Sequence, residues 1–282
     1  MKSEKLDGKK IIFIGNSFIY YGGCVDVRNP KPSVDDRGYF EELCRANGET
    51  VSVTDATYGG HHFYDFVDKC FCGGASTHEG GSDLLAGLEL ASYDYIVMAE
   101  SGDRFGDDAT HGSTVDNFRK IRRRFIDAGC RGKFVYCIHT YPYTSKKFYC
   151  DFAVSQAEEL KKEGVITVNW GAPIYEAMSS GSIPGTDTSF DKNTFIVKQS
   201  AKDGYHPNLL TGYLSALAVR HVITGESSEG QPYEFCSTVR DFDDYYGKYY
   251  GFEGSTGNFR EVFASPDAML ALQKLVDKYN PA

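Results

Sequence analysis

The sequence predicts an α/β fold: a doubly wound, three-layer sandwich around a five-stranded parallel sheet. The 282-residue chain is 41% hydrophobic and 24% charged, which supplies enough apolar side chains for one large core. Five short apolar runs, rich in β-branched residues, alternate with segments of helical periodicity along most of the chain. This alternation is typical of parallel strands joined by right-handed helical crossovers. A single domain over residues 1–282 is therefore expected.

The first predicted strand, residues 10–14 (KIIFI), ends at Gly15 and has the pattern of a buried parallel strand followed by a tight turn. Four similar runs are expected to complete the sheet: residues 51–54, 95–99, 133–138 and 165–168. Because functional loops gather at the carboxyl ends of parallel strands, the site should lie at that edge.

Helical periodicity predicts the connecting elements and three later helices. The expected helices cover residues 38–46, 84–90, 115–128, 151–163, 172–179, 207–223 and 266–279. The basic run 120–124 (KIRRR) fits a solvated helix face. Residues 225–265 are rich in glycine and aromatic side chains, and we interpret them as an appendage or lid of the same domain.

Charge and hydropathy exclude two classes of partner. The formal net charge is −9, which argues against non-specific binding to nucleic acid, since such binding needs clustered Lys and Arg. No apolar run approaches the roughly 20 residues that span a bilayer. The first residues, MKSEKLDGKK, lack the features of a secretory signal, so a cytoplasmic protein is expected if Met1 is the natural start.

The cysteines are too sparse for a disulfide scaffold, and none form a C-x-x-C pair. We interpret them as mostly reduced core thiols: Cys24, Cys44, Cys70, Cys72, Cys130, Cys137, Cys150 and Cys236. The densest candidate metal ligands are His61, His62, Cys70, Cys72 and His78, but their spacings match no common zinc framework. A metal-dependent hydrolase built on this cluster stays an alternative.

Two short motifs carry the candidate chemistry. Gly15-Asn16-Ser17 follows the first strand, which would expose the Ser17 hydroxyl near the N–H groups of a helix start. Asp203-Gly204-Tyr205-His206-Pro207 precedes a late helix, and an aspartate three residues before a histidine can receive its Nδ1–H. Taken singly, both motifs also fit ordinary turn and capping chemistry.

Together the two motifs resemble those of the SGNH (GDSL-like) hydrolase family, whose chains show G-[DN]-S first and D-x-x-H-P last. The resemblance covers residues 10–225. It implies a flavodoxin-like sheet, no metal or organic cofactor, and a serine esterase that works through an acyl-enzyme. The implied substrate carries a short acyl group such as acetyl on a carbohydrate or other small molecule. Carried over, Ser17 is the nucleophile, His206 the general base and Asp203 its orienting carboxylate.

The oxyanion hole of that family matches this chain in part. The glycine donor after the second strand corresponds to Gly60, with Gly59 as the near alternative. The asparagine donor after the third strand has no counterpart, because the chain reads Ala99-Glu100-Ser101 there. This is similar to a bacterial branch of unclear function with a Q-E-Q segment, in which Ser101 takes the place of the second glutamine.

Glu100 adjoins the expected oxyanion site, so its carboxylate must point away or bind polar groups of the substrate. His61, His62 and the aromatic residues 245–252 are candidates for lining a substrate pocket. The alternative from another class is a non-catalytic carbohydrate- or ligand-binding module that keeps the fold.

Overall fold

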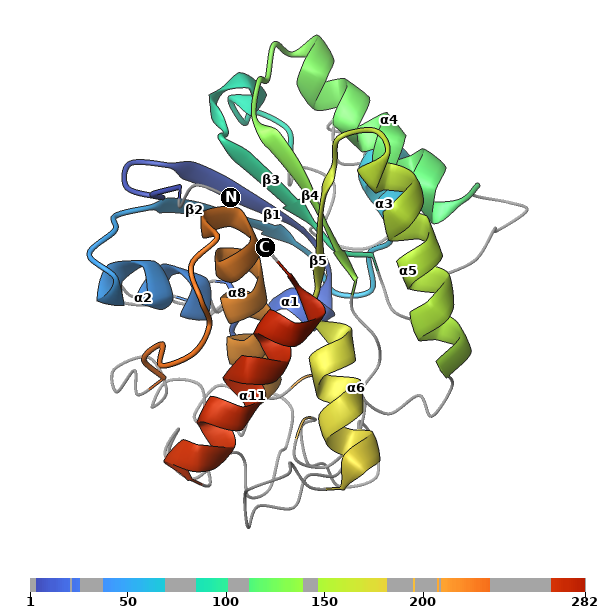
Figure 1. The fold of residues 1–282 in the computed structure, drawn as a ribbon. Helices are drawn as coiled ribbons and strands as arrows, with labels where there is room; N and C mark the ends of the chain where they lie inside the picture. Colours follow the sequence, from blue (N-terminus) through green and yellow to red (C-terminus); the bar gives the residue numbers. More distant parts are fainter. Residues whose placement is uncertain are drawn as a thin grey trace, which may run out of the picture.

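Five parallel strands form one sheet in the order β2-β1-β3-β4-β5 (Figure 1). Their bounds are β1 Lys10–Gly15, β2 Ser52–Thr57, β3 Tyr95–Met98, β4 Lys133–Ile138 and β5 Ile166–Asn169. The computed structural model describes residues 4–20, 22–25, 38–68, 85–100, 112–138, 147–181, 195, 207, 209–233 and 265–281. The predicted fold class is confirmed, and the strand order reverses direction between β1 and β3.

Helices cover both faces of this sheet (Figure 1). One face carries α2 Tyr39–Ala46, α6 Gly171–Ser180, α8 Leu209–Thr224 and α11 Pro266–Tyr279. The other carries α3 Phe63–Asp68, α4 Thr114–Asp127 and α5 Lys147–Lys161. The alternation along β1 explains the two layers: Ile11 and Phe13 enter the first core, and Ile12 and Ile14 enter the second.

The structure corrects several predicted helices. The helix expected over residues 84–90 is wrong: within the described residues 85–92 the only helical element is the 3-10 helix η1, Leu90–Ser92. Gly87 adopts a φ of 77°, which interrupts the helical path. Helix α5 begins four residues earlier than predicted, and α8 begins at Leu209 rather than Pro207. Most of residues 225–265 lies outside the described residues.

A glycine allows the close approach of α8 to the chain that follows β1. An ideal Cβ at Gly212 would lie 1.6 Å from the backbone oxygen of Gly22. No side chain fits in that space, so the helix can reach the segment beyond α1, Ser17–Tyr20, only with glycine at this position.

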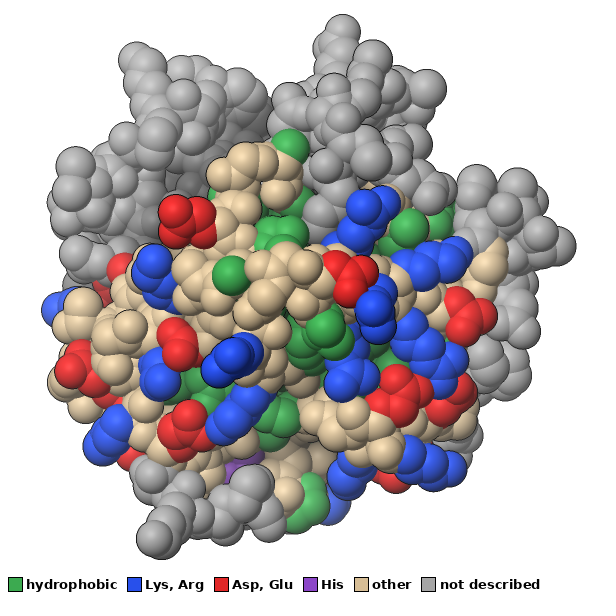
Figure 2. Space-filling model, turned by 90° about the horizontal axis from the view of Figure 1, so that it is seen from above, with side chains coloured by type: hydrophobic (Ala, Val, Ile, Leu, Met, Phe, Trp, Pro, Cys, Tyr) green, Lys and Arg blue, Asp and Glu red, His purple; other side chains and the backbone are tan. Residues whose placement is uncertain are grey.

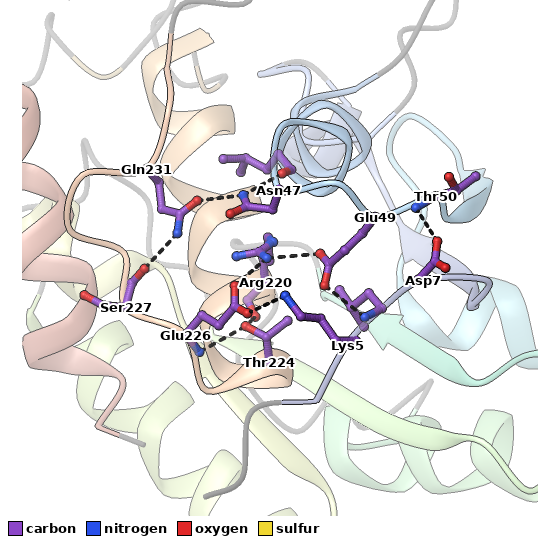
Figure 3. Close-up of polar contacts among 12 residues, drawn as sticks. Lys5, Asp7, Asn47, Glu49, Thr50, Arg220, Thr224, Glu226, Ser227 and Gln231 are labelled. Atoms are coloured by element: carbon purple, nitrogen blue, oxygen red, sulfur yellow. Dashed lines mark hydrogen bonds and ion pairs between the residues drawn. The ribbon is translucent and has the colours of Figure 1, made fainter.

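A buried ionic cluster ties α8 to the amino-terminal edge of the sheet (Figure 3). The Arg220 guanidinium, 1% exposed, pairs with Glu49 at 3.0 Å and with Glu226 at 2.6 Å. Glu49 also accepts the N–H of Leu6 at 3.1 Å, and Lys5 lies 3.2 Å from Glu226. The hydrogen bond from Arg220 holds the pKa of Glu226 below its ordinary value.

The face of the molecule seen in Figure 2 mixes charges of both signs among the described residues. On α4 the guanidinium of Arg119 contacts Glu163 and Glu159, and Arg123 pairs with Asp127 at 2.8 Å. Within residues 120–124, Lys120, Arg123 and Arg124 are exposed while Ile121 is buried, which confirms the predicted solvated face. Among the described residues, no helix is long and apolar enough to cross a membrane.

Four of the eight cysteines lie where the structure describes their side chains, and all four are buried free thiols: Cys24, Cys44, Cys130 and Cys137. The interpretation of reduced core thiols is confirmed for these four. The side chains of the other cysteines lie outside the described residues.

Candidate active site

Ser17 begins helix α1, directly after β1 ends at Gly15, and its side chain is buried. Asn16 stabilises this turn by accepting two backbone hydrogen bonds. Its side-chain oxygen accepts the N–H of Phe18 at 3.1 Å, and its backbone oxygen accepts the N–H of Ile19 at 3.0 Å. The sequence Gly15-Asn16-Ser17 therefore forms a capped helix start at the carboxyl end of the central strand, as the motif predicts.

The turn that holds Gly59 and Gly60 lies beside Ser17 because β1 and β2 are neighbours. Gly15 is paired with Thr57 in the register of the two strands, and Tyr58 N–H donates to the Gly15 oxygen at 2.9 Å. Gly60 has a φ of 71°, a conformation that side-chain-bearing residues rarely adopt. An ideal Cβ at Gly59 would lie 2.9 Å from the Tyr20 hydroxyl, so α1 and this turn pack closely.

A side chain joins these two turns. The Asn16 amide donates to the backbone oxygen of His61 at 3.0 Å, and Asn16 is 1% exposed. The sequence argument missed this contact, although a polar residue between a strand-end glycine and Ser17 is the signal that could have indicated it. The bond fixes the distance between the start of α1 and the turn after β2.

Glu100 follows β3 on the other side of β1, and its carboxylate points to the start of α3. Both carboxylate oxygens accept the N–H of Phe63, at 3.2 and 3.1 Å. The Oε1 atom of Glu100 also lies 3.4 Å from Nδ1 of His62. The carboxylate is buried, and its charge adds to the burial that raises the pKa of Tyr136 above the ordinary value.

Helix α3 was not predicted, although its sequence carries a start signal. The Asp65 carboxylate accepts the N–H of His62 at 3.0 Å, which is the reciprocal half of a capping box. Phe63 and Phe66 then bury one face of this short helix in the core against α4. An aspartate three residues after the cap position, with a phenylalanine on each side of it at helical spacing, could have revealed it.

The remaining predicted site residues lie outside the described residues: Ser101, Asp203 and His206. Their neighbours are placed. Glu100 directly precedes Ser101, and the buried Pro207 directly follows His206, two residues before α8 begins. The structure therefore brings together Ser17, Gly59, Gly60 and Glu100 at one edge of the sheet.

Of the candidate metal ligands, His61 and His62 lie within the described residues, and Cys70, Cys72 and His78 do not. The His61 ring is buried between Tyr58, at a centroid distance of 4.5 Å, and Phe66, at 5.6 Å. The His62 ring stacks on Tyr64. In the part of the chain that the structure describes, no group of three or more His, Cys, Asp or Glu side chains is arranged to hold a metal.

Known structures share this fold. No protein-family profile and no curated protein matches the sequence. An acetylxylan esterase from Geobacillus stearothermophilus, Axe2, is 13% identical with a TM-score of 0.53, over 79% of this chain and 98% of that chain. LAE5, an α/β hydrolase from the metagenome of Lake Arreo, is 13% identical with a TM-score of 0.51, over 78% and 96%.

A DUF4886 family protein from Bacteroides uniformis is 15% identical with a TM-score of 0.55, and the match covers 96% of this chain and 93% of that chain. At these identities the likeness shows the fold alone, an α/β fold around a five-stranded parallel sheet. The expectation of fold that the two motifs raised is confirmed at this level.

Proposed function

We propose that the protein is a serine esterase that hydrolyses a carboxylic ester through an acyl-enzyme. The observation that carries this proposal is the place of Ser17: it starts a helix at the carboxyl end of β1, beside the turn that contains Gly60. In the strand order 2-1-3-4-5 this position adjoins the switch point between β1 and β3, where doubly wound proteins bind their ligands.

Three residues carry out the proposed reaction, and the proton moves between two of them, Ser17 and His206. His206 takes the Ser17 proton as the hydroxyl oxygen attacks the ester carbonyl, and Asp203 orients the imidazole and stabilises its charge. The tetrahedral intermediate collapses with cleavage of the ester C–O bond, and the alcohol leaves with the proton from His206. A water molecule then attacks the acyl-enzyme while His206 takes its proton. The Ser17–acyl C–O bond breaks, His206 returns the proton to the Ser17 oxygen, and the carboxylic acid is released.

Amide and hydroxyl donors stabilise the negative charge that develops on the carbonyl oxygen. We assign this role to the N–H groups of Ser17 and Gly60, with Ser101 as a third donor in the place of the absent asparagine. Donors of this kind act mainly in the transition state, and losing one typically lowers kcat by ~10²–10³.

The proposed substrate carries a short acyl group such as acetyl, attached to a carbohydrate or another small molecule. Support comes from the fold that the chain shares with an acetylxylan esterase. Because one fold serves many substrates, the acyl group and the alcohol must be measured.

Turnover of a short-chain chromogenic ester and of an acetylated xylo-oligosaccharide tests the proposal. The parent protein should hydrolyse at least one of them, and Ser17→Ala and His206→Ala should lose up to ~10⁶ in kcat while remaining folded. A parent that binds an acetylated sugar without hydrolysing any ester would support the non-catalytic binding module instead.

A further inference from the structure

We infer that Glu100 is a positioning residue that holds the Gly60 turn in place, and that it does not bind substrate. The inference rests on the proposed function, because it assigns to this turn the donor of the oxyanion hole. Its basis is the pair of contacts from the Glu100 carboxylate to the N–H of Phe63 and toward His62 Nδ1.

The segment from Tyr58 to Phe63 is short, and each of its ends is fixed to a different strand. At its start, Tyr58 N–H donates to the oxygen of Gly15 on β1 at 2.9 Å. At its end, the Phe63 N–H donates to Glu100, which follows β3. The turn therefore crosses the carboxyl end of β1 and is held by bonds to residues at the ends of β1 and β3.

Contacts inside the segment transmit this geometry to Gly60. The N–H of His61 donates to the oxygen of Tyr58 at 3.2 Å, and the oxygen of His61 accepts the amide of Asn16 at 3.0 Å. Gly60 lies between these bonds in a left-handed conformation. Without Glu100, the α3 end of this segment keeps the bond from His62 N–H to Asp65 and the core packing of Phe63, but loses its bond to the residue that follows β3, so the direction of the Gly60 N–H is less firmly set.

The chemistry of the carboxylate also argues for this role. Glu100 is 3% exposed, and both of its oxygens lie within 3.2 Å of the Phe63 nitrogen. An acceptor bond to a backbone N–H at a helix start is favourable for a carboxylate. Because the Glu100 carboxylate accepts the Phe63 N–H at the start of α3, its negative charge is directed to that helix and not to the developing oxyanion.

Two conservative variants separate positioning from substrate binding. Glu100→Gln keeps the length of the side chain and an oxygen acceptor for Phe63, but loses the charge. Glu100→Asp keeps the charge, but is one methylene too short to reach Phe63 N–H. A positioning role predicts that Gln keeps kcat within about threefold of the parent, and that Asp loses roughly 10–100-fold in kcat with little change in KM. The opposite order, with Asp active and Gln inactive, would overturn the inference in favour of a charge that contacts substrate.

Amide hydrogen exchange gives a readout that does not depend on activity. In Glu100→Asp and Glu100→Ala, the amides of residues 59–63 should exchange faster than in the parent, and those of β1 should not. Glu49→Ala is the matched control, since Glu49 is equally buried and also accepts a backbone N–H, at the opposite edge of the sheet. It should lower stability without a selective effect on residues 59–63.

Unchanged amide exchange at residues 59–63 in both Glu100→Asp and Glu100→Ala would overturn the inference, whatever the esterase activity of these variants. A parent that hydrolyses no ester but shows the selective exchange effect would overturn the proposed function and leave the positioning role of Glu100 supported. The two failures are therefore distinguishable.

Discussion

The side-chain amide of Asn16 donates a hydrogen bond to the backbone oxygen of His61 at 3.0 Å, which joins the turn after β1 to the turn after β2. The two residues are 45 positions apart in the chain, and the contact is buried. It couples the place of Ser17 to the place of Gly60, the two residues that the proposed mechanism assigns to the carbonyl carbon and its oxygen.

Replacing Asn16 tests this coupling. Asn16→Ala removes the bond to His61 and the cap on Phe18 N–H, and should lower the free energy of unfolding by about 1–3 kcal/mol because the buried His61 oxygen and the partly buried Phe18 N–H each lose this bond. It should also lower ester turnover through kcat. Asn47→Ala is the control, since its amide donates to the Leu43 oxygen at 2.8 Å, near the opposite edge of the sheet. A variant with parental turnover would show that the two turns keep their geometry without this bond.

The Arg220 cluster predicts an acid-dependent contribution to stability. The pKa of Glu226 is lowered by its hydrogen bond from Arg220, so its stabilising effect is fully present above the ordinary pKa and is lost as pH falls through the lowered value. Glu226→Gln should therefore be less stable than the parent by about 1 kcal/mol at pH 7, and the difference should shrink below pH ~4.5.

Urea unfolding of the parent and Glu226→Gln between pH 7 and pH 3 measures this difference. Glu229→Gln removes an exposed carboxylate 3.9 Å from Lys274, and should change stability little at pH 7. A Glu226→Gln effect that grows toward pH 3 would contradict the assigned direction of the pKa shift.

Three core thiols should resist alkylation in the folded protein. Burial raises the pKa of Cys24 and Cys137 above the ordinary value, and raises that of Cys44 to about 12. Because the thiolate is the reactive form, iodoacetamide at pH 8 should label these residues only after unfolding in urea. Peptide mapping by mass spectrometry checks the result, and native labelling as fast as in urea would show that these thiols are accessible.

Replacing Gly212 by alanine should change the stability of the protein through two effects of opposite sign. Alanine in the middle of a helix is favoured over glycine by about 1 kcal/mol, so propensity alone predicts that Gly212→Ala stabilises α8. The 1.6 Å approach of the added Cβ to the Gly22 oxygen predicts a loss of about 1–3 kcal/mol or more instead. We expect the clash to dominate, and a raised Tm in the variant would show that the two segments can separate at little cost.

The sequence reveals the sheet because burial on both faces leaves a local pattern. The β1 sequence KIIFIG is apolar throughout after Lys10, and its alternate side chains enter the two cores. The helix expected at 84–90 fails because the leucine spacing fits a helix while Gly87, inside it, takes a left-handed conformation.

The sequence predicts those parts of the candidate site that lie in short motifs next to a strand. Ser17 and Gly60 follow strands in short motifs, so their meeting at one edge follows from the parallel sheet. Glu100 bonds to Phe63, 37 residues away in the chain, and the contact crosses β1 from the end of β3 to the start of α3. Such a contact requires the strand register and the helix position, which no local pattern contains.

Covalent labelling with a fluorophosphonate tests the central claim most directly. Attack by an activated serine forms an O–P bond and releases fluoride, so the intact mass should rise by a single phosphonyl group, and peptide mapping should place it on Ser17. Ser17→Ala should stay unlabelled, whereas Ser113→Ala, which removes the cap of α4, should label like the parent. A parent protein that stays unmodified, or an adduct on any other residue, would contradict the account.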